Sequence, residues 1–395
     1  MRFFFLLMFD GINESGVNKK ILSQVQELNT QGIDAKLILI GGQNKNSESP
    51  YAGSPHIIWK TMTENKNNTV FTPIVHSRKV AGIIRECIQD LGPSDILYIR
   101  YPLLILFCPI NFFKPFRKCK LIFEYNSILS QEYLLTCHYL YLFFELFFGN
   151  IVLLQADGGI GVTHEITEFN RKRPGSVNTP VITISNGIVV DSIPLRSLPK
   201  MERDQKIILV CVADFSPWHG IDRIINGIAR YTGSRSVILH LVGGGSEIPY
   251  LRNLAVQNNL SDNIVFHEAL SGPKLDKVFD ESHIAVGSLG MHRNKLSESS
   301  TLKSREYCSR GIPYIIACSD PDFPDEFPYI LRVPPDESFI NMEQVVMFVS
   351  RVFQDPEHPK KMRQYAIEHL DYSNKVKSLK TFLEERILKS DEIKT

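Results

Sequence analysis

The sequence predicts an α/β protein made of two doubly wound parallel-sheet domains, and three observations lead to this prediction. Short, continuously apolar runs, such as 1–9 and 206–213, are typical of strands buried on both faces of a parallel sheet. In both halves of the chain such runs alternate with amphipathic helical segments, which is the rhythm of βαβ units. The length of 395 residues suits two domains of ordinary size, and the stretch 191–206 has the prolines and mixed charges of a linker.

Composition limits the kind of protein that this chain can be. Hydrophobic residues make up 43% and charged residues 22%, which predicts a soluble globular protein with ample core. The net charge of +1 argues against a dedicated nucleic-acid binder. The seven cysteines form no C-x-x-C pair or zinc spacing, and an odd count fits a reducing cytosol. We therefore expect a cytoplasmic protein, with peripheral contact to the cytoplasmic face of a membrane left open.

The N-terminal run at 1–9 is predicted to be a buried first strand rather than a signal peptide. The run is short, no small-residue cleavage site follows it, and Asp10 ends it. A loop with glycines at 10–17, an amphipathic segment at 18–31 and a strand at 35–40 then complete a βαβ unit. This glycine loop is weak evidence for a site, because an ordinary βα turn carries glycines too.

The apolar, aromatic run at 133–155 approaches the ~20 residues of a transmembrane span. His138, Glu145 and Asn150 interrupt it, and a carboxylate in the middle of a span is costly in lipid. We therefore expect a helix packed against the sheet, with one face at a membrane as an open alternative to full burial. Just upstream, the segment 112–120 mixes aromatic residues with lysine and arginine, which suits either an anionic membrane interface or an exposed basic loop.

The remaining elements follow the same alternation. In the first half, strands are predicted near 56–59, 95–101, 120–126, 159–163 and 181–186, with a helix at 77–91. In the second half, strands are predicted at 206–213, 236–241, 263–267, 283–287 and 313–317. Helices are predicted there near 220–231, 247–259, 273–280, 300–310, 342–353 and 359–389.

One stretch, 298–313, combines the parts of a sugar-nucleotide site. Ser299 and Ser300 are expected to cap a short helix, and Gly311 to end it in a left-handed conformation. The free N–H groups at a helix N-terminus suit a diphosphate, and Lys303 in the first turn adds a full charge. Carboxylates before and inside the helix suit the hydroxyls of a sugar and a ribose. The alternative is a solvated helix face with local ion pairs.

Three elements together resemble the nucleotide-binding half of the group 1, or family four, retaining glycosyltransferases. They are the stretch 298–313, the segment 215–222 after the strand at 206–213, and the segment 241–247 after the strand at 236–241. The resemblance is specific over 206–320 and weaker over 1–190. It implies the GT-B fold, in which two Rossmann-like domains face a cleft. The expected domains are 1–195 for the acceptor and 205–371 for the nucleotide sugar, with a C-terminal helix at about 372–395 packing back onto the first.

The resemblance also implies an activity: transfer of a sugar, with retention, from a nucleotide sugar such as a UDP- or GDP-sugar. The acceptor would be a saccharide or a lipid-linked saccharide, in polysaccharide or glycoconjugate biosynthesis. No cofactor or metal is expected, since helix N–H groups and basic side chains neutralise the diphosphate in the family. The sequence has no Asp-x-Asp motif suited to binding a metal ion at the diphosphate. The nearest candidate is Asp320-Pro-Asp322, which follows a strand and contains a proline.

Carried over by position, the family's functional residues divide into two sets. Glu298, Lys303 and His219 are the candidates for the reacting centre, with Glu298 near the donor sugar's hydroxyls. The other donor-binding candidates are Gly16, Asn126, Trp218, Gly243, Gly244, Ser300, Thr301, Leu302 and Glu306. Among them Glu306 would bind the ribose, and the backbone N–H groups of 300–302 would lie near the diphosphate.

The chain departs from the family at three of these positions. Asn126 stands where members often carry a histidine, and Asp214 and His219 stand where many carry an arginine and a lysine. His219 and Lys303 are therefore the remaining candidate cations; alternatively, His219 packs beside Trp218 and bonds the backbone. A GT-B epimerase acting on a sugar nucleotide and a catalytically silent nucleotide-binding homologue stay open as other functions.

Overall fold

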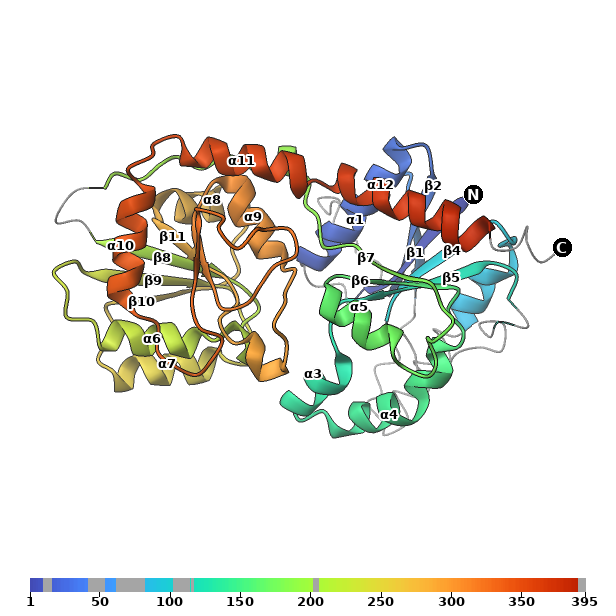
Figure 1. Ribbon diagram of the computed structural model, residues 1–395, viewed down its shortest axis with the longest axis horizontal. Helices are drawn as coiled ribbons and strands as arrows, with labels where there is room; N and C mark the ends of the chain where they lie inside the picture. The colour runs from blue at the N-terminus through green and yellow to red at the C-terminus, as the bar shows by residue number, and fades with distance from the viewer. Residues whose placement is uncertain are drawn as a thin grey trace. The chain divides into compact units, whose positions relative to one another are not determined.

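The computed structural model describes residues 1–9, 16–41, 54–61, 82–101, 114, 117–201 and 206–389, which fall into two compact units (Figure 1). Unit 1 contains Met1–Ser185 and Tyr372–Thr395, and unit 2 contains Asn186–Asp371. Each unit is an α/β structure around one parallel sheet, so the predicted fold class of two doubly wound domains is confirmed.

The sheet of unit 1 has seven strands, all parallel, in the order β3-β2-β1-β4-β5-β6-β7. The strands are β1 (Arg2–Phe9), β2 (Asp34–Gly41), β3 (Ile57–Thr61), β4 (Ile96–Arg100), β5 (Lys120–Tyr125), β6 (Gly158–Gly161) and β7 (Val181–Thr183). The apolar β1 occupies the middle of this sheet, where Phe3 and Phe5 are fully buried against Tyr98 of β4. The expected buried first strand is thus confirmed.

The helices of unit 1 cover this sheet. They are α1 (Gly16–Thr30), α3 (Leu129–Leu135), α4 (Tyr139–Leu153), α5 (His164–Arg171), α12 (Tyr372–Phe382) and the π-helical η5 (Leu383–Leu388). In Figure 1 the C-terminal helix α12, in red, lies beside α1, in blue. Val376, Leu379 and Phe382 of α12 belong to the same core as the apolar side of α1. The chain after residue 371 is therefore part of unit 1. The predicted helix at 77–91 begins outside the described residues, which are helical from 82 to 89.

The predicted single helix at 133–155 is instead two helices, α3 and α4. Cys137 lies between them with φ of 57°, a left-handed conformation that a non-glycine residue adopts rarely and that breaks a helix. A periodicity argument could not find this break, because apolar residues continue through it. Among the described residues, none of the helices has both the length and the apolar character that crossing a membrane requires.

The sheet of unit 2 has six parallel strands in the order β10-β9-β8-β11-β12-β13. The strands are β8 (Ile207–Val212), β9 (Val237–Val242), β10 (Ile264–His267), β11 (Ile284–Val286), β12 (Tyr314–Ile316) and β13 (Ile330–Arg332). The first five confirm the predicted strands. Strand β13 was not predicted, because it lies in a stretch rich in prolines, between Pro328 and Pro334, and such a stretch is typical of a loop.

The helices of unit 2 are α6 (Ile221–Ala229), α7 (Ile248–Gln257), α8 (Gly272–Glu281), α9 (Leu302–Arg310), α10 (Met342–Val352) and α11 (His358–His369). Short 3-10 turns occur at η2 (Val190–Ser192), η3 (Pro217–His219) and η4 (Met291–Asn294). The predicted long helix at 359–389 is wrong, because α11 ends at His369 and α12 starts at Tyr372. At this break Asp371 forms an isolated bridge with Ile188.

The first unit ends earlier than the predicted boundary at residue 195. Residues 186–195 belong to unit 2 because their backbone is bonded to it. The Asn186 amide donates to Ser300 Oγ at 2.8 Å, and Ile188 N donates to Leu370 O at 3.0 Å. Arg363 of α11 donates to the carbonyls of Val190 and Ile193. The first residues of the predicted linker at 191–206 are therefore part of unit 2.

Candidate functional site

The candidate site lies at the carboxyl edge of the sheet of unit 2, where the strand order changes direction. From β8 the chain builds outward through β9 and β10, and then continues on the other side with β11, β12 and β13. In doubly wound sheets, ligands bind beyond the carboxyl ends of the strands at this switch point. Here the switch point is between β8 and β11. The loop with η3 follows β8, and the segment that leads into α9 follows β11.

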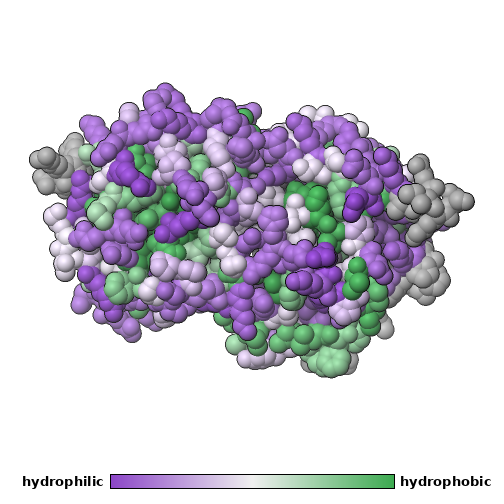
Figure 2. All heavy atoms as spheres, in the orientation of Figure 1, coloured by the Kyte–Doolittle hydropathy of each residue, from purple (hydrophilic) through white to green (hydrophobic). Residues whose placement is uncertain are grey.

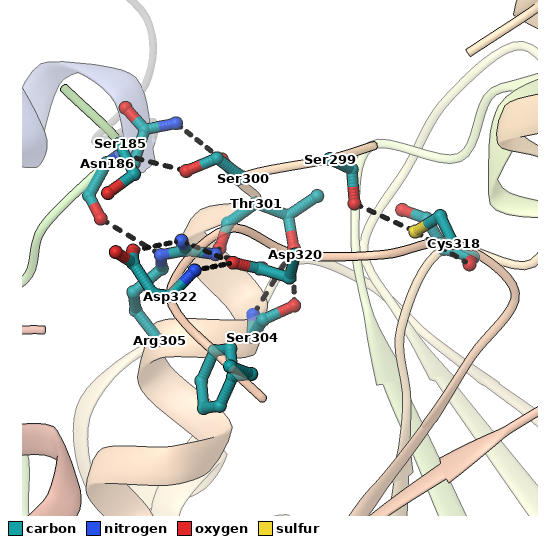
Figure 3. Close-up of polar contacts among 12 residues, drawn as sticks. Ser185, Asn186, Ser299, Ser300, Thr301, Ser304, Arg305, Cys318, Asp320 and Asp322 are labelled. Atoms are coloured by element: carbon teal, nitrogen blue, oxygen red, sulfur yellow. Dashed lines mark hydrogen bonds and ion pairs between the residues drawn. The ribbon is translucent and has the colours of Figure 1, made fainter. Parts of the chain in front are cut away.

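The N-terminus of α9 is built differently from the prediction. The N-cap is Thr301, whose Oγ1 accepts from Ser304 N at 3.3 Å, so the expected capping by Ser299 and Ser300 is wrong. Ser300 instead binds Asn186 through its hydroxyl and its carbonyl, and Ser299 Oγ lies 2.9 Å from Cys318 Sγ (Figure 3). Gly311 ends the helix with φ of 74°, as predicted. The first N–H groups of α9 have no partner inside the helix, as at any helix start.

Arg305 lies beneath this helix start and is fully buried. Its guanidinium binds both carboxylate oxygens of Asp320, and Nη2 also lies 2.5 Å from Asp322 Oδ2 (Figure 3). Its Nε donates to the carbonyl of Asn186 at 2.9 Å. Burial alone would lower the pKa of the guanidinium, but the two carboxylates outweigh it and raise that pKa. The cluster therefore fixes the start of α9 to the segments that carry Asn186 and Asp320.

The ammonium group of Lys303 is buried at the same end of the sheet. Its Nζ has no hydrogen-bond partner among the described residues. The nearest ionisable groups include the thiols of Cys211 in β8 and Cys318 after β12, and the ring of His219. Burial lowers the pKa of Lys303, since the charged form loses its hydration there. Lys303 thus provides a donor group with unused hydrogen-bonding capacity at the switch point.

His219 bonds the backbone of its own turn. Ser216 N donates to His219 Nδ1 at 3.0 Å, so the ring proton of the neutral imidazole is on Nε2. The ring lies between Phe215 and Trp218, with centroids 6.2 and 6.0 Å away. Burial, and then the neighbouring charge of Lys303, keep the pKa of His219 well below 6.5. The geometry favours the alternative in which His219 is a neutral group beside Trp218 rather than a cation.

This geometry predicts the pH dependence of nucleotide binding. A ring with a lowered pKa is already neutral near pH 7, and it stays neutral as the pH rises. We therefore expect wild type and His219→Gln to show the same pH profile of UDP affinity between about pH 7 and 9 in calorimetric titrations. A weakening with rising pH that only the wild type shows would contradict the neutral assignment.

The glycines after β9 bring two loops into backbone contact. At Gly243, φ is 126° and a Cβ would lie 2.1 Å from the carbonyl oxygen of Ala213. At Gly245, φ is 122° and a Cβ would lie 2.3 Å from Phe215 N. Between them, Gly244 accepts from Phe215 N at 2.7 Å, is exposed, and has open space where a Cβ would point. Gly243 thus has a packing role, and Gly244 is the glycine that a ligand can reach.

The two glutamates of the predicted site have different surroundings. Glu298 is half-buried and forms a backbone bridge with Ser319, next to the end of β12. Glu306 is in the middle of α9, where Arg310 Nε donates to its Oε1 at 2.9 Å. Arg310 also binds Asp276, at 2.7 Å. The local ion pair that the sequence offered as an alternative is therefore present at Glu306, although its carboxylate remains partly exposed.

Two predicted site residues lie in unit 1. Gly16 is the first residue of α1, and the rest of its loop lies outside the described residues. Asn126 follows β5, and its Oδ1 accepts from Lys20 Nζ at 3.4 Å. Lys20 is buried and forms an ion pair with Glu124, 2.5 Å away. Asn126 thus belongs to a buried polar cluster at the carboxyl edge of the first sheet.

Residues 198–327 match the family described as Glycosyl transferases group 1, and the matched segment contains η3, the glycine loop and α9. This segment is similar to the group 1 glycosyltransferases. The resemblance stated on 206–320 is therefore confirmed where it was specific. No curated protein matches the sequence of the chain.

Solved structures similar to this chain extend the comparison to both units. Sucrose-phosphate synthase from Thermosynechococcus elongatus is 16% identical with a TM-score of 0.70, covering 98% of this chain and 99% of its own. Anabaena Alr3699/HepE in complex with UDP and glucose is 13% identical with a TM-score of 0.63, and the match covers 98% of this chain and 100% of the Anabaena chain. The pneumococcal O-GlcNAc transferase in complex with UDP and GlcNAc is 10% identical with a TM-score of 0.59, covering 98% and 99%. At these identities the likeness concerns the fold, which is GT-B.

The residues that support the candidate site were not predicted from the sequence. Asp320 and Asp322 stood out there only as the nearest candidate for an Asp-x-Asp motif, whereas both carboxylates bind Arg305. The local sequence gives no sign that Asn186 is the partner of Ser300. The spacing of the two aspartates was a usable signal, but the sequence does not show that an arginine is buried opposite them. Among the described residues there is no cluster of three or more His, Cys, Asp or Glu side chains arranged to bind a metal ion.

Proposed function

We propose that this chain is a retaining glycosyltransferase that moves a sugar from a nucleotide sugar, such as a UDP- or GDP-sugar, to a saccharide or lipid-linked saccharide. The group 1 match and the GT-B fold support glycosyl transfer. Similar structures contain UDP with glucose or with GlcNAc, which supports a nucleotide-sugar donor. Retention, the acceptor and a role in polysaccharide or glycoconjugate biosynthesis follow from the family resemblance.

One observation supports the donor site most directly: the buried ammonium of Lys303 without a hydrogen-bond partner. A buried charge without a partner is unfavourable, so an anion bound beside it would gain a strong, charge-assisted interaction. Lys303 is the second residue of α9, where the helix N–H groups also favour an anion. Both features occur at the switch point where doubly wound sheets bind nucleotides. We infer that the diphosphate of the donor binds there.

The remaining residues receive roles around this diphosphate. Glu306 would accept from the ribose hydroxyls with the oxygen that Arg310 leaves free, and Glu298 would bind hydroxyls of the donor sugar. The Nε2–H of His219 would donate a neutral hydrogen bond, and the N–H groups of 300–302 would complete the anion site. With these donors the diphosphate needs no metal ion, and the leaving diphosphate itself would take the acceptor's proton. We therefore assign no side chain as general base.

A thermal-shift screen of UDP-, GDP- and ADP-sugars tests the proposal. A donor at about 100 times its dissociation constant stabilises the folded protein by ~2.7 kcal/mol, which is enough to rank the three bases. We expect sugars of one base to give a clearly larger thermal shift than the others. The Lys303→Met variant should stay folded and should lose this shift. A shift without any turnover in the presence of saccharide acceptors would indicate the silent homologue, and formation of an epimer without acceptor would indicate the epimerase. No shift with any nucleotide would overturn the donor site.

We also propose that the protein is peripheral on the cytoplasmic face of a membrane, since a lipid-linked acceptor would be found there. The basic segment at 112–120 supports this less well than expected. Arg117 is buried, and its guanidinium binds Asp157 at 2.7 Å and the Gln155 carbonyl. Lys114 pairs with the same aspartate at 3.2 Å but stays exposed, as does Lys118. Most of the residues at 112–116 lie outside the described part of the chain.

A further inference from the structure

Helix α4 of unit 1 buries its one charged residue, Glu145, and exposes most of its large apolar residues. Its buried residues are Glu145, Gly149, Val152 and Leu153, which share one side of the helix. The opposite side is a stripe at the i, i+3 and i+7 spacing, made of Leu140, Phe143, Phe147, Ile151 and Leu154. All five are exposed, Leu140 by 67% and Phe147 by 64%. An ordinary surface helix instead turns its apolar stripe toward the core and its charged residues toward solvent.

Polar bonds fix this reversed orientation. Tyr101 OH donates to the Glu145 carboxylate, and Arg173 forms an ion pair with the same group at 2.5 Å. Arg173 Nε also donates to Asn150 Oδ1 at 3.2 Å, one turn along the helix. Rotating the apolar stripe inward would break these buried bonds and leave the Glu145 carboxylate without a partner, which costs free energy. The outward stripe is therefore the stable arrangement within unit 1.

The apolar surface is large and continuous. More than half of the exposed large hydrophobic side chains among the described residues lie between 134 and 154. Figure 2 shows them as a green area at the lower edge, where Figure 1 places α4. Patches of this kind mark sites of interaction with proteins or membranes. The aromatic rings of Tyr139, Tyr141 and Phe143 contribute much of it.

The charges around the stripe are complementary to an anionic surface. Between residues 133 and 156 the only Asp, Glu, Lys or Arg is Glu145, which is buried and neutralised. The exposed charges next to the helix are basic: Lys114, whose backbone N donates to Gln155, and Lys172, the residue before Arg173. Lys118 is exposed in the same connection as Lys114. Tyrosines, phenylalanines and flanking lysines are the composition that suits a lipid headgroup region.

We propose that the exposed stripe of α4 inserts into the interfacial region of an anionic lipid bilayer and is the membrane-docking surface of this protein. The helix has 15 residues, about 22 Å at 1.5 Å per residue, and its inner side is bonded to the unit, so it lies along the surface rather than across it. The inference deepens the proposed membrane contact and does not depend on the donor site. It replaces the basic segment 112–120 as the main contact.

Vesicle flotation tests the surface. The triple variant Leu140→Ser, Phe143→Ser, Phe147→Ser removes three of the five apolar side chains of the stripe without touching the inner bonds of α4. A matched control, Tyr250→Ser, Val256→Ser, Met347→Ser, removes exposed side chains of similar size from unit 2, where Val256 is 65% and Met347 64% exposed. With vesicles of phosphatidylcholine and phosphatidylglycerol, we expect the stripe variant to lose at least about tenfold in partitioning, and the control to match the wild type. Equal partitioning by all three proteins would overturn the proposal.

A second measurement separates lipid from a second copy of the chain. Phe147→Trp places a fluorophore in the stripe, and its emission should shift to the blue and be quenched by brominated lipid when vesicles are added. Analytical ultracentrifugation without lipid should show a monomer. A blue shift that appears with protein concentration alone, together with a dimer that the stripe variant abolishes, would overturn the proposal in favour of self-association.

The charge arm of the test uses Lys114→Gln, Lys118→Gln, Lys172→Gln. We expect this variant to lose the preference for anionic vesicles while keeping weaker binding to both kinds. If this variant loses all binding to vesicles while the stripe variant binds like the wild type, the contact is purely electrostatic, and the insertion of α4 is contradicted. UDP-induced thermal shifts, measured on the same variants, should stay at the wild-type value. A failure of the donor proposal would appear in the thermal shifts, and a failure of the membrane proposal would appear in the flotation.

Discussion

Replacing Arg305 with methionine is expected to destabilise unit 2 by about 3–5 kcal/mol, as removal of one partner of a buried ion pair does. The guanidinium is fully buried and is bound by Asp320 and Asp322, so its removal leaves two carboxylates without a counter-charge. The carbonyl of Asn186 also loses its donor. Denaturant unfolding followed by circular dichroism measures the loss as a shift of the midpoint.

A matched control distinguishes this cluster from an ordinary ion pair. Arg171 in unit 1 binds Glu168 with two hydrogen bonds, but both side chains are exposed. Arg171→Met should therefore cost at most about 1 kcal/mol. Adding Asp320→Asn and Asp322→Asn to Arg305→Met should recover part of the stability, because the uncompensated charges are gone. Equal losses in Arg305→Met and Arg171→Met would contradict the structural role of the cluster.

Glu306→Ala is expected to weaken donor binding by roughly 10- to 150-fold. The variant removes charge-assisted hydrogen bonds to the ribose of about 1.5–3 kcal/mol, and ~1.4 kcal/mol corresponds to a factor of ten. Folding should survive, because Arg310 keeps its second partner Asp276. Calorimetric titration with the best nucleotide of the donor screen measures the change.

Asp276→Ala is the control for this prediction. It removes the other carboxylate of Arg310 and leaves Glu306 in place. If Glu306 acts on the ribose, Asp276→Ala should change donor affinity little. If Glu306 acts only by pairing with Arg310, the two variants should behave alike, and an unchanged affinity in a folded Glu306→Ala variant would remove this residue from the site.

The strands of the fold could be predicted from sequence because burial on both faces leaves a continuous apolar run. β1 and β8 are such runs, and their positions were predicted to within a residue or two. The start of α9 could not be placed as well. Ser300 has the side chain of a cap, but it is bonded to Asn186, a residue more than a hundred positions away. Local preference cannot show such a contact, and Thr301 takes the cap instead.

The candidate site shows the same division between local and distant information. Lys303 was placed correctly at the first turn of the helix, but its burial and its interactions with the thiols of Cys211 and Cys318 come from the tertiary structure. The role of Arg305 could not be predicted, because the carboxylates that bind it come 15 and 17 residues later in the sequence. His219 was considered as a cation, yet its bond to Ser216 N and its burial make it neutral.

The break between α3 and α4 gives the protein a natural point of attachment for a reporter group. Burial raises the pKa of the Cys119 thiol and of the Cys318 thiol to about 11, and raises that of Cys308 further, so these thiols react slowly with alkylating reagents at neutral pH. Of the cysteines in the described part of the chain, Cys137 is the exposed one. It stands two residues before Tyr139, where α4 begins. In a Cys108→Ser variant, which removes the one cysteine outside the described residues, a brief reaction with a maleimide dye would therefore mark the start of that helix.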